Sequence, residues 1–193
     1  MVGSERGVAT LWDVANGDYL GALAGPDPGV QVQGTAFSPD GRLAAMASED
    51  RTATIWDVAS REPLHQLVGH DDKVFGVRFS PDGRTLATNG FDDKVILWDV
   101  ATGGMIRQLI GHTDYVFHVD WSSDGSRLLT ASRDSTLILW DAATGAVLHR
   151  YRDETGRSFT ASFIDDRHAV SGGSSGTGPS TCCMNSMPTE SPV

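Results

Sequence analysis

The 193-residue chain has only two cysteines, and they are neighbours, Cys182 and Cys183. Adjacent cysteines lack the two-residue spacer of a zinc site, and they cannot cross-link distant parts of a fold. We therefore expect the chain to fold without a disulfide and to bind neither a metal nor another cofactor. A protein of this kind suits a reducing compartment, and the cytoplasm is the expected location.

Basic residues are scarce and scattered. The chain has 15 Lys and Arg residues against 25 Asp and Glu residues, which gives a formal net charge of -10. A nucleic-acid-binding surface would require a cluster of basic side chains, so neither nucleic acids nor anionic membranes are expected partners. The sequence also has no apolar run near the ~18 residues of a membrane span. Its N-terminus lacks the apolar core of a signal peptide.

Long helical periodicity is missing as well, and short alternating apolar runs take its place. These runs flank tight turns such as Ser80-Pro81-Asp82-Gly83. In such a turn proline sets φ at the second position, and glycine adopts a conformation that other residues resist. The pattern indicates half-buried strands, so we predict an all-β fold of four-stranded antiparallel sheets.

The dominant signal is an internal repeat. The dipeptide Trp-Asp begins at Trp12, Trp56, Trp98 and Trp140, so successive tryptophans are 44, 42 and 42 residues apart. The Ser-Pro-Asp-Gly turn recurs in the same phase, in a weaker form at Ser122, and Gly-His occurs before two of the repeats. Several features that share one period indicate a repeated structural unit.

This pattern resembles the WD-repeat, or β-transducin-like, family over about residues 1–173. In that family each repeat is one four-stranded blade, and the blades are arranged radially around a channel. The resemblance implies about four blades of an incomplete β-propeller: a half blade of two strands at 1–24, blades at 25–67, 68–109 and 110–150, and a partial blade at 151–173. Residues 174–193 are rich in Ser, Thr, Pro and Gly, and we predict a disordered tail there.

The family resemblance further implies a buried polar tetrad of His, Thr, Asp and Trp. Two repeats match it in full, one with His70, Thr88, Asp92 and Trp98 and the other with His112, Thr130, Asp134 and Trp140. A buried indole N–H and a buried imidazole cost free energy unless each finds a hydrogen-bond partner, and the tetrad would supply those partners. A catalytic His-Asp pair is the alternative, but an enzyme needs one site and not a copy in each repeat.

The repeat around Trp56 departs from this pattern. Pro26 stands where the histidine would be, and Met46 replaces the hydroxyl residue. We expect this blade to be less rigid than the next two.

Partner-binding residues of WD propellers lie on one rim, in the loop before the first strand and the turn before the tetrad Asp. The resemblance places seven residues of the chain there: Lys73, Phe75, Phe91, Tyr115, Phe117, Arg133 and Glu49. Aromatic and arginine side chains often anchor interfaces. The alternative for Phe75 and Phe117 is packing between the blades.

We therefore expect a non-catalytic scaffold that presents a propeller rim to other proteins or peptides. Two alternatives stay open: part of an enzyme or of a larger signalling or regulatory protein, and a truncated remnant without independent function. Four blades fall short of the seven or so in most WD propellers. Self-association of two copies to complete the ring is one expected outcome, beside a fragment without its partners and a small closed ring.

Overall fold

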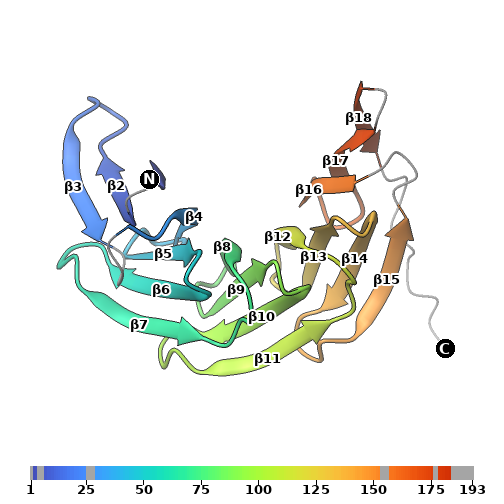
Figure 1. The fold of residues 1–193 in the computed structure, drawn as a ribbon, viewed down its shortest axis with the longest axis horizontal. Helices are drawn as coiled ribbons and strands as arrows, with labels where there is room; N and C mark the ends of the chain where they lie inside the picture. Colours follow the sequence, from blue (N-terminus) through green and yellow to red (C-terminus); the bar gives the residue numbers. More distant parts are fainter. Residues whose placement is uncertain (1, 4–6, 25–28, 153–156, 176–177, 184–193) are drawn as a thin grey trace.

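The computed structural model describes residues 2–3, 7–24, 29–152, 157–175 and 178–183. These residues form five antiparallel sheets that lie side by side along an open arc (Figure 1). All regular structure in the described ranges is β-strand, and no helix that could cross a membrane occurs there.

Each of the three central sheets has four strands in chain order. The second sheet contains β4 (Val32–Phe37), β5 (Leu43–Ser48), β6 (Thr52–Asp57) and β7 (Pro63–Val68). The third contains β8 (Val74–Phe79), β9 (Thr85–Gly90), β10 (Lys94–Asp99) and β11 (Met105–Ile110). The fourth contains β12 (Val116–Trp121), β13 (Arg127–Ser132), β14 (Thr136–Asp141) and β15 (Val147–Arg152). The first strand of each sheet lies on the concave side of the arc and the last on the convex side (Figure 1).

The two terminal sheets have three strands each and lie at opposite ends of the arc (Figure 1). The first contains β1 (Val2–Gly3), β2 (Val8–Trp12) and β3 (Tyr19–Ala24). The fifth contains β16 (Arg157–Phe163), β17 (Ala169–Ser175) and β18 (Gly178–Cys183).

Both terminal sheets differ from the sequence prediction. The half blade at 1–24 has β1 in addition to the two expected strands, and residues 178–183 form β18 where a disordered tail was predicted. Sheet pairing uses backbone N–H and C=O groups, so β18 pairs with β17 although the segment has few apolar side chains. Residues 184–193 lie outside the described part of the chain, as does Pro26.

The turns between the first and second strands of the three central sheets share one geometry. In each, the serine hydroxyl donates to the aspartate two residues later at 2.6 Å. The glycines at the fourth position, Gly41, Gly83 and Gly125, have positive φ angles of 71°, 72° and 73°. The turn at Ser122 lacks proline and still folds in this way. Its serine hydroxyl lowers the pKa of Asp124 to about 2, because a hydrogen bond to a carboxylate favours the charged form.

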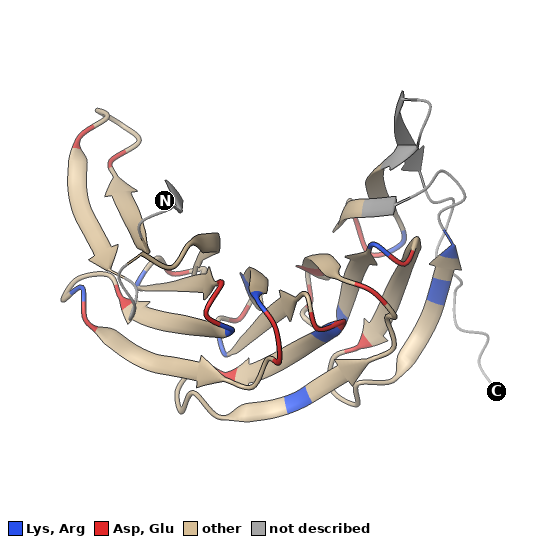
Figure 2. Ribbon diagram, viewed as in Figure 1, with Lys and Arg blue, Asp and Glu red and all other residues tan. Residues whose placement is uncertain are grey.

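Charged residues are concentrated in the turns and loops, whereas most of the strands carry few charges (Figure 2). The core lies between the sheets. In the three central sheets, the face that carries the repeat tryptophan packs on apolar residues of the preceding sheet. Trp56, for example, packs in one cluster with Ala9, Leu11 and Leu23. Burial of this face drives the stacking of one repeat on the next.

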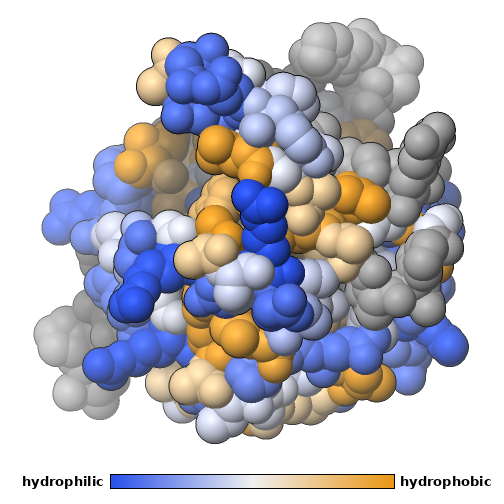
Figure 3. Space-filling model, turned by 90° about the vertical axis from the view of Figure 1, so that its left-hand side faces the viewer, coloured by the Kyte–Doolittle hydropathy of each residue, from blue (hydrophilic) through white to orange (hydrophobic). Residues whose placement is uncertain are grey.

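The tryptophan of the first sheet has a different environment. Trp12 is 49% exposed, whereas Trp56, Trp98 and Trp140 are 6%, 2% and 1% exposed. No described sheet precedes the first one, so the corresponding face is open. Figure 3 views this end of the molecule and shows apolar patches between hydrophilic side chains.

Candidate interaction surface

The third sheet contains a continuous hydrogen-bond chain built from its four tetrad residues. The indole Nε1 of Trp98 donates to Thr88 Oγ1 at 2.9 Å, and Thr88 Oγ1 lies 2.7 Å from His70 Nε2. His70 Nδ1 lies 2.9 Å from the carboxylate of Asp92. If Nδ1 carries the proton and donates to Asp92, then Nε2 accepts from the threonine hydroxyl, and every polar atom of the chain has a partner.

The fourth sheet repeats this chain with the same distances, 2.9 Å from Trp140 to Thr130, 2.7 Å from Thr130 to His112 and 2.9 Å from His112 to Asp134. Thr136 adds a further hydroxyl that donates to Asp134 at 2.6 Å. Burial by itself would raise the pKa of Asp134, but hydrogen bonds from His112 and Thr136 together outweigh it and hold that pKa well below its usual range.

The tetrads fix the loops at one end of the strands. The Asp92 carboxylate also accepts from the backbone N–H of Asp71 at 2.9 Å, and Asp134 accepts from that of Thr113 at 3.0 Å. Each aspartate thereby joins the loop before an innermost strand to the turn between the second and third strands. In the third and fourth sheets the rim of the arc, defined as these loops and turns together, is therefore tied by exposed hydrogen bonds to aspartates whose tetrads continue into the buried interior.

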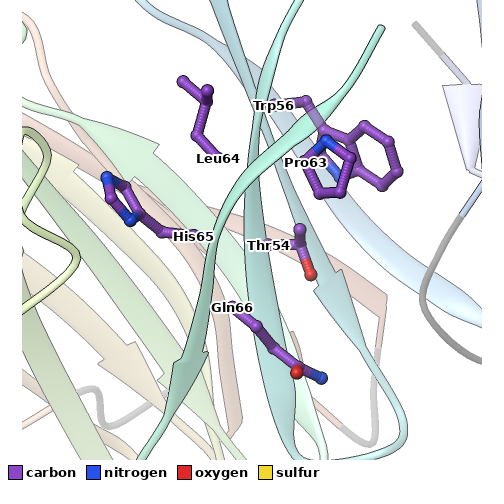
Figure 4. Close-up of a pocket in the computed structure, with 6 residues that line it drawn as sticks. All are labelled: Thr54, Trp56, Pro63, Leu64, His65 and Gln66. Carbon is purple, nitrogen blue, oxygen red and sulfur yellow. The ribbon is translucent and has the colours of Figure 1, made fainter.

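The second sheet has no such chain among its described residues. The indole Nε1 of Trp56 is buried and has no hydrogen-bond partner among the residues that the structure describes, and Met46 stands at the position of the tetrad threonine. In the third sheet, Gly69 of the Gly-His segment lies closely over Trp98 and Met105. In the second sheet, Trp56 and Pro63 occupy the positions of Trp98 and Met105. Together with their neighbours they line a cavity of about 270 Å³ (Figure 4). Its described lining residues are Thr54, Trp56, Pro63, Leu64, His65 and Gln66.

The first strands of the second to fifth sheets, β4, β8, β12 and β16, carry a bulge at the same position. The pairing register shifts between Val32 and Gly34, Val74 and Gly76, Val116 and His118, and Ser158 and Thr160. The extra residue in each bulge is Gln33, Phe75, Phe117 or Phe159. A bulge turns its side chain out of the regular alternation. Three aromatic rings thus align across three sheets, with centroids 5.6 Å apart for Phe75 and Phe117 and 5.2 Å apart for Phe117 and Phe159.

A second row of side chains stands on the turns between the second and third strands. The backbone N–H groups of Glu49, Phe91 and Arg133 donate to the carbonyls of Gln31, Lys73 and Tyr115 at 3.1, 2.9 and 2.9 Å. The Phe91 ring stacks on the Tyr115 ring, with centroids 4.3 Å apart and an interplanar angle of 8°. The centroid of the Phe91 ring also lies 5.7 Å from that of Phe75. The Arg133 guanidinium lies 5.3 Å from the centre of the Tyr115 ring, as in a cation–π contact.

The structure therefore brings the seven predicted rim residues onto one surface. Its centre is the aromatic patch, which consists of Phe75, Phe91, Tyr115, Phe117 and Phe159. The first four side chains are partly buried and Phe159 is 41% exposed, so the patch is neither core nor fully open. Beside it, Lys73 pairs with Glu49 at 3.0 Å.

Two of the carboxylates that flank the aromatic patch were not among the predicted rim residues. Asp93 lies in the turn after Phe91 with a φ of 64°, and Asp114 precedes Tyr115 and lies 3.7 Å from Arg133. Their positions next to rim aromatics are the signal that could have identified them. Among the described residues, no group of three or more His, Cys, Asp or Glu side chains is arranged to hold a metal ion.

The fold and the tetrads together define an array of WD-type propeller blades. The family model "WD domain, G-beta repeat" matches residues 17–57, 61–99 and 103–141, which is more than half of the chain. The chain therefore belongs to the WD-repeat family, whose members generally mediate protein–protein interactions and are typically not catalytic. A search of curated proteins finds no match to the chain.

The matched repeats are offset from the sheets by one strand. The match at 61–99 begins with β7, the outer strand of the second sheet, and ends with β10 in the third. Each repeat of the sequence therefore spans two neighbouring sheets, and the covalent chain links them. The blade boundaries given above follow the sheets, and the family repeats follow the chain.

Proposed function

We propose that the chain is a non-catalytic scaffold that binds a partner protein or peptide through the aromatic patch on its rim. The supporting observation is that five aromatic side chains from three sheets contact one another at a partly exposed position. Aromatic groups in such positions supply much of the binding energy of protein interfaces. Bulges and buried tetrads hold them in place, so little ordering is needed on binding.

The His-Asp pairs support a non-catalytic role. The side chains of His70 and His112 are only 1% exposed, and both ring nitrogens of each are engaged within a tetrad. A general base needs a proton of the substrate within hydrogen-bond reach, and these imidazoles are buried away from any substrate. We place the protein in the cytoplasm, on the scarcity of cysteine in its sequence.

A displayed library of random 12-residue peptides tests the proposal. Peptides selected on the wild-type protein are assayed by fluorescence anisotropy against a Phe75→Ala/Phe117→Ala variant. We expect at least about a tenfold loss of affinity, because two ring faces of the patch are removed.

The matched control is Ile106→Ala, which removes an exposed apolar side chain from the convex strand β11. It should bind the selected peptides as the wild type does. Circular dichroism checks that both variants remain folded. Selected peptides that bind the folded aromatic variant with unchanged affinity, or no selected peptides at all, would contradict the proposal.

A further inference from the structure

Carboxylates outnumber basic groups around the aromatic patch. Three of the four basic side chains in the described part of the rim are paired, Lys73 with Glu49, Arg133 with Asp114 and Lys94 with Asp71; the fourth, Arg51, lies in the turn of the second sheet. Two further rim carboxylates, Asp72 and Asp93, have no ion pair within the described part of the chain. The surface therefore keeps a negative charge after its internal pairs are counted.

The negative charge is concentrated where the third and fourth sheets meet. Burial raises the pKa of Asp93, and the nearby carboxylates of Asp114, Asp92 and Asp134 raise it further. In the second sheet the corresponding turn position is Arg51, which has a similar φ of 73°. The excess of negative charge is thus a feature of this one place on the rim and not of every repeat.

The rings of Phe91 and Tyr115 stack at this same junction of the third and fourth sheets. Asp93 follows the Phe91 turn, Asp114 precedes Tyr115, and the two rings are parallel within 8°. A guanidinium already lies over the Tyr115 ring, since Arg133 occupies that position within the chain itself. Because Phe75 and Arg133 cover the outer sides of this ring pair, the carboxylates of Asp93 and Asp114 are the groups left to bind a cationic side chain of a partner.

This inference rests on the proposed function and specifies its partner. We infer that the aromatic patch binds a basic peptide segment that places an Arg or Lys between Asp93 and Asp114. An apolar side chain next to that residue would cover Phe75, Phe117 and Phe159. An acidic segment would meet repulsion at the same carboxylates, and charge complementarity of this kind determines which partner is accepted.

The displayed peptide library provides the test. We expect Arg or Lys next to a large apolar residue to be enriched among the selected peptides. A synthetic peptide of the enriched sequence should bind an Asp93→Asn/Asp114→Asn variant about fivefold to tenfold more weakly than the wild type, which is typical for the loss of two partly exposed charge pairs. Raising the salt concentration from about 0.05 M to 0.5 M should weaken wild-type binding.

The asparagine variant is designed to keep the fold. Asparagine tolerates a positive φ, as required at residue 93, and its carbonyl can still accept the backbone N–H of Tyr115, which Asp114 binds at 2.8 Å. An Asp18→Asn/Glu62→Gln variant is the control, because it removes two charges from turns at the opposite ends of the strands. It should bind the peptide like the wild type.

The outcomes separate this inference from the proposed function. Selected peptides without basic residues, or equal binding by the wild type and the Asp93→Asn/Asp114→Asn variant, would overturn the basic partner. If the same peptides still required Phe75 and Phe117, the proposed function would stand. Selected peptides that ignore the aromatic patch would overturn both.

Discussion

At the scale of single residues, the tetrad threonine holds a central position. Thr130 Oγ1 accepts from the indole of Trp140 and contacts the imidazole of His112, and the threonine itself is fully buried. Loss of this hydroxyl would leave two buried polar groups without a partner. Such a loss costs more than the net contribution of one hydrogen bond, since the desolvation of each group is no longer compensated.

Thr130→Val should therefore lower the free energy of unfolding by about 1–3 kcal/mol, although valine has nearly the same shape. Urea unfolding followed by tryptophan fluorescence measures the change. Thr160→Val is the control, because Thr160 is exposed on β16. Equal stability of Thr130→Val and the wild type would contradict the assignment of the tetrad as a stabilising network.

At the scale of elements, equivalent strands differ in how their hydrogen-bonding groups are satisfied. In β10 the tryptophan donates a hydrogen bond to a threonine, whereas in β6 the indole of Trp56 has no partner in the described part of the chain and lies next to a cavity. Local opening of a protein is easier where fewer interactions oppose it. The sequence prediction of a less rigid second blade has the same physical basis.

We expect the backbone amides of β6 (Thr52–Asp57) to exchange with solvent deuterium about tenfold faster than those of β10 (Lys94–Asp99). Native-state hydrogen exchange measured by NMR gives both rates in one experiment. A Thr88→Val variant is the internal comparison, because it breaks the tetrad of the third sheet and should bring β10 toward the rate of β6. Equal protection of both strands in the wild type would contradict this expectation.

At the scale of the whole molecule, the arc is open, and the apolar faces of each sheet are buried only by the sheets next to it. In the first sheet, the ring centroids of Trp12 and Tyr19 are 5.3 Å apart, and the two residues are 49% and 57% exposed. The corresponding tryptophans are covered in the second, third and fourth sheets. An apolar surface that is buried in the other repeats favours association when it is left open.

The 193-residue chain should therefore self-associate as its concentration rises, and Trp12→Ser should weaken this association. Sedimentation velocity over a range of concentrations measures both effects. Ile164→Ser is the control, because Ile164 is an exposed apolar residue in the turn between β16 and β17. A monomer at every concentration would contradict the prediction.

The residues that form each sheet were predictable from the sequence because their information is local and periodic. Strand alternation, the Ser-Pro-Asp-Gly turns and the spacing of the tryptophans repeat every 42 to 44 residues. At residues 178–183 the structure has β18 where the composition predicts a disordered tail, and the pairing of this strand depends on backbone groups that the side-chain composition does not reveal.

The sequence by itself determined the repeat, the strands of the central sheets and the types of residue available for each tetrad. Only the tertiary structure decided that Phe75, Phe117 and Phe159 share one surface and that Asp93 and Asp114 lie beside it. These aromatic residues are 42 positions apart along the chain. They meet because equal bulges on stacked sheets bring equivalent positions together, and the distance between sheets is set by the packing of the core.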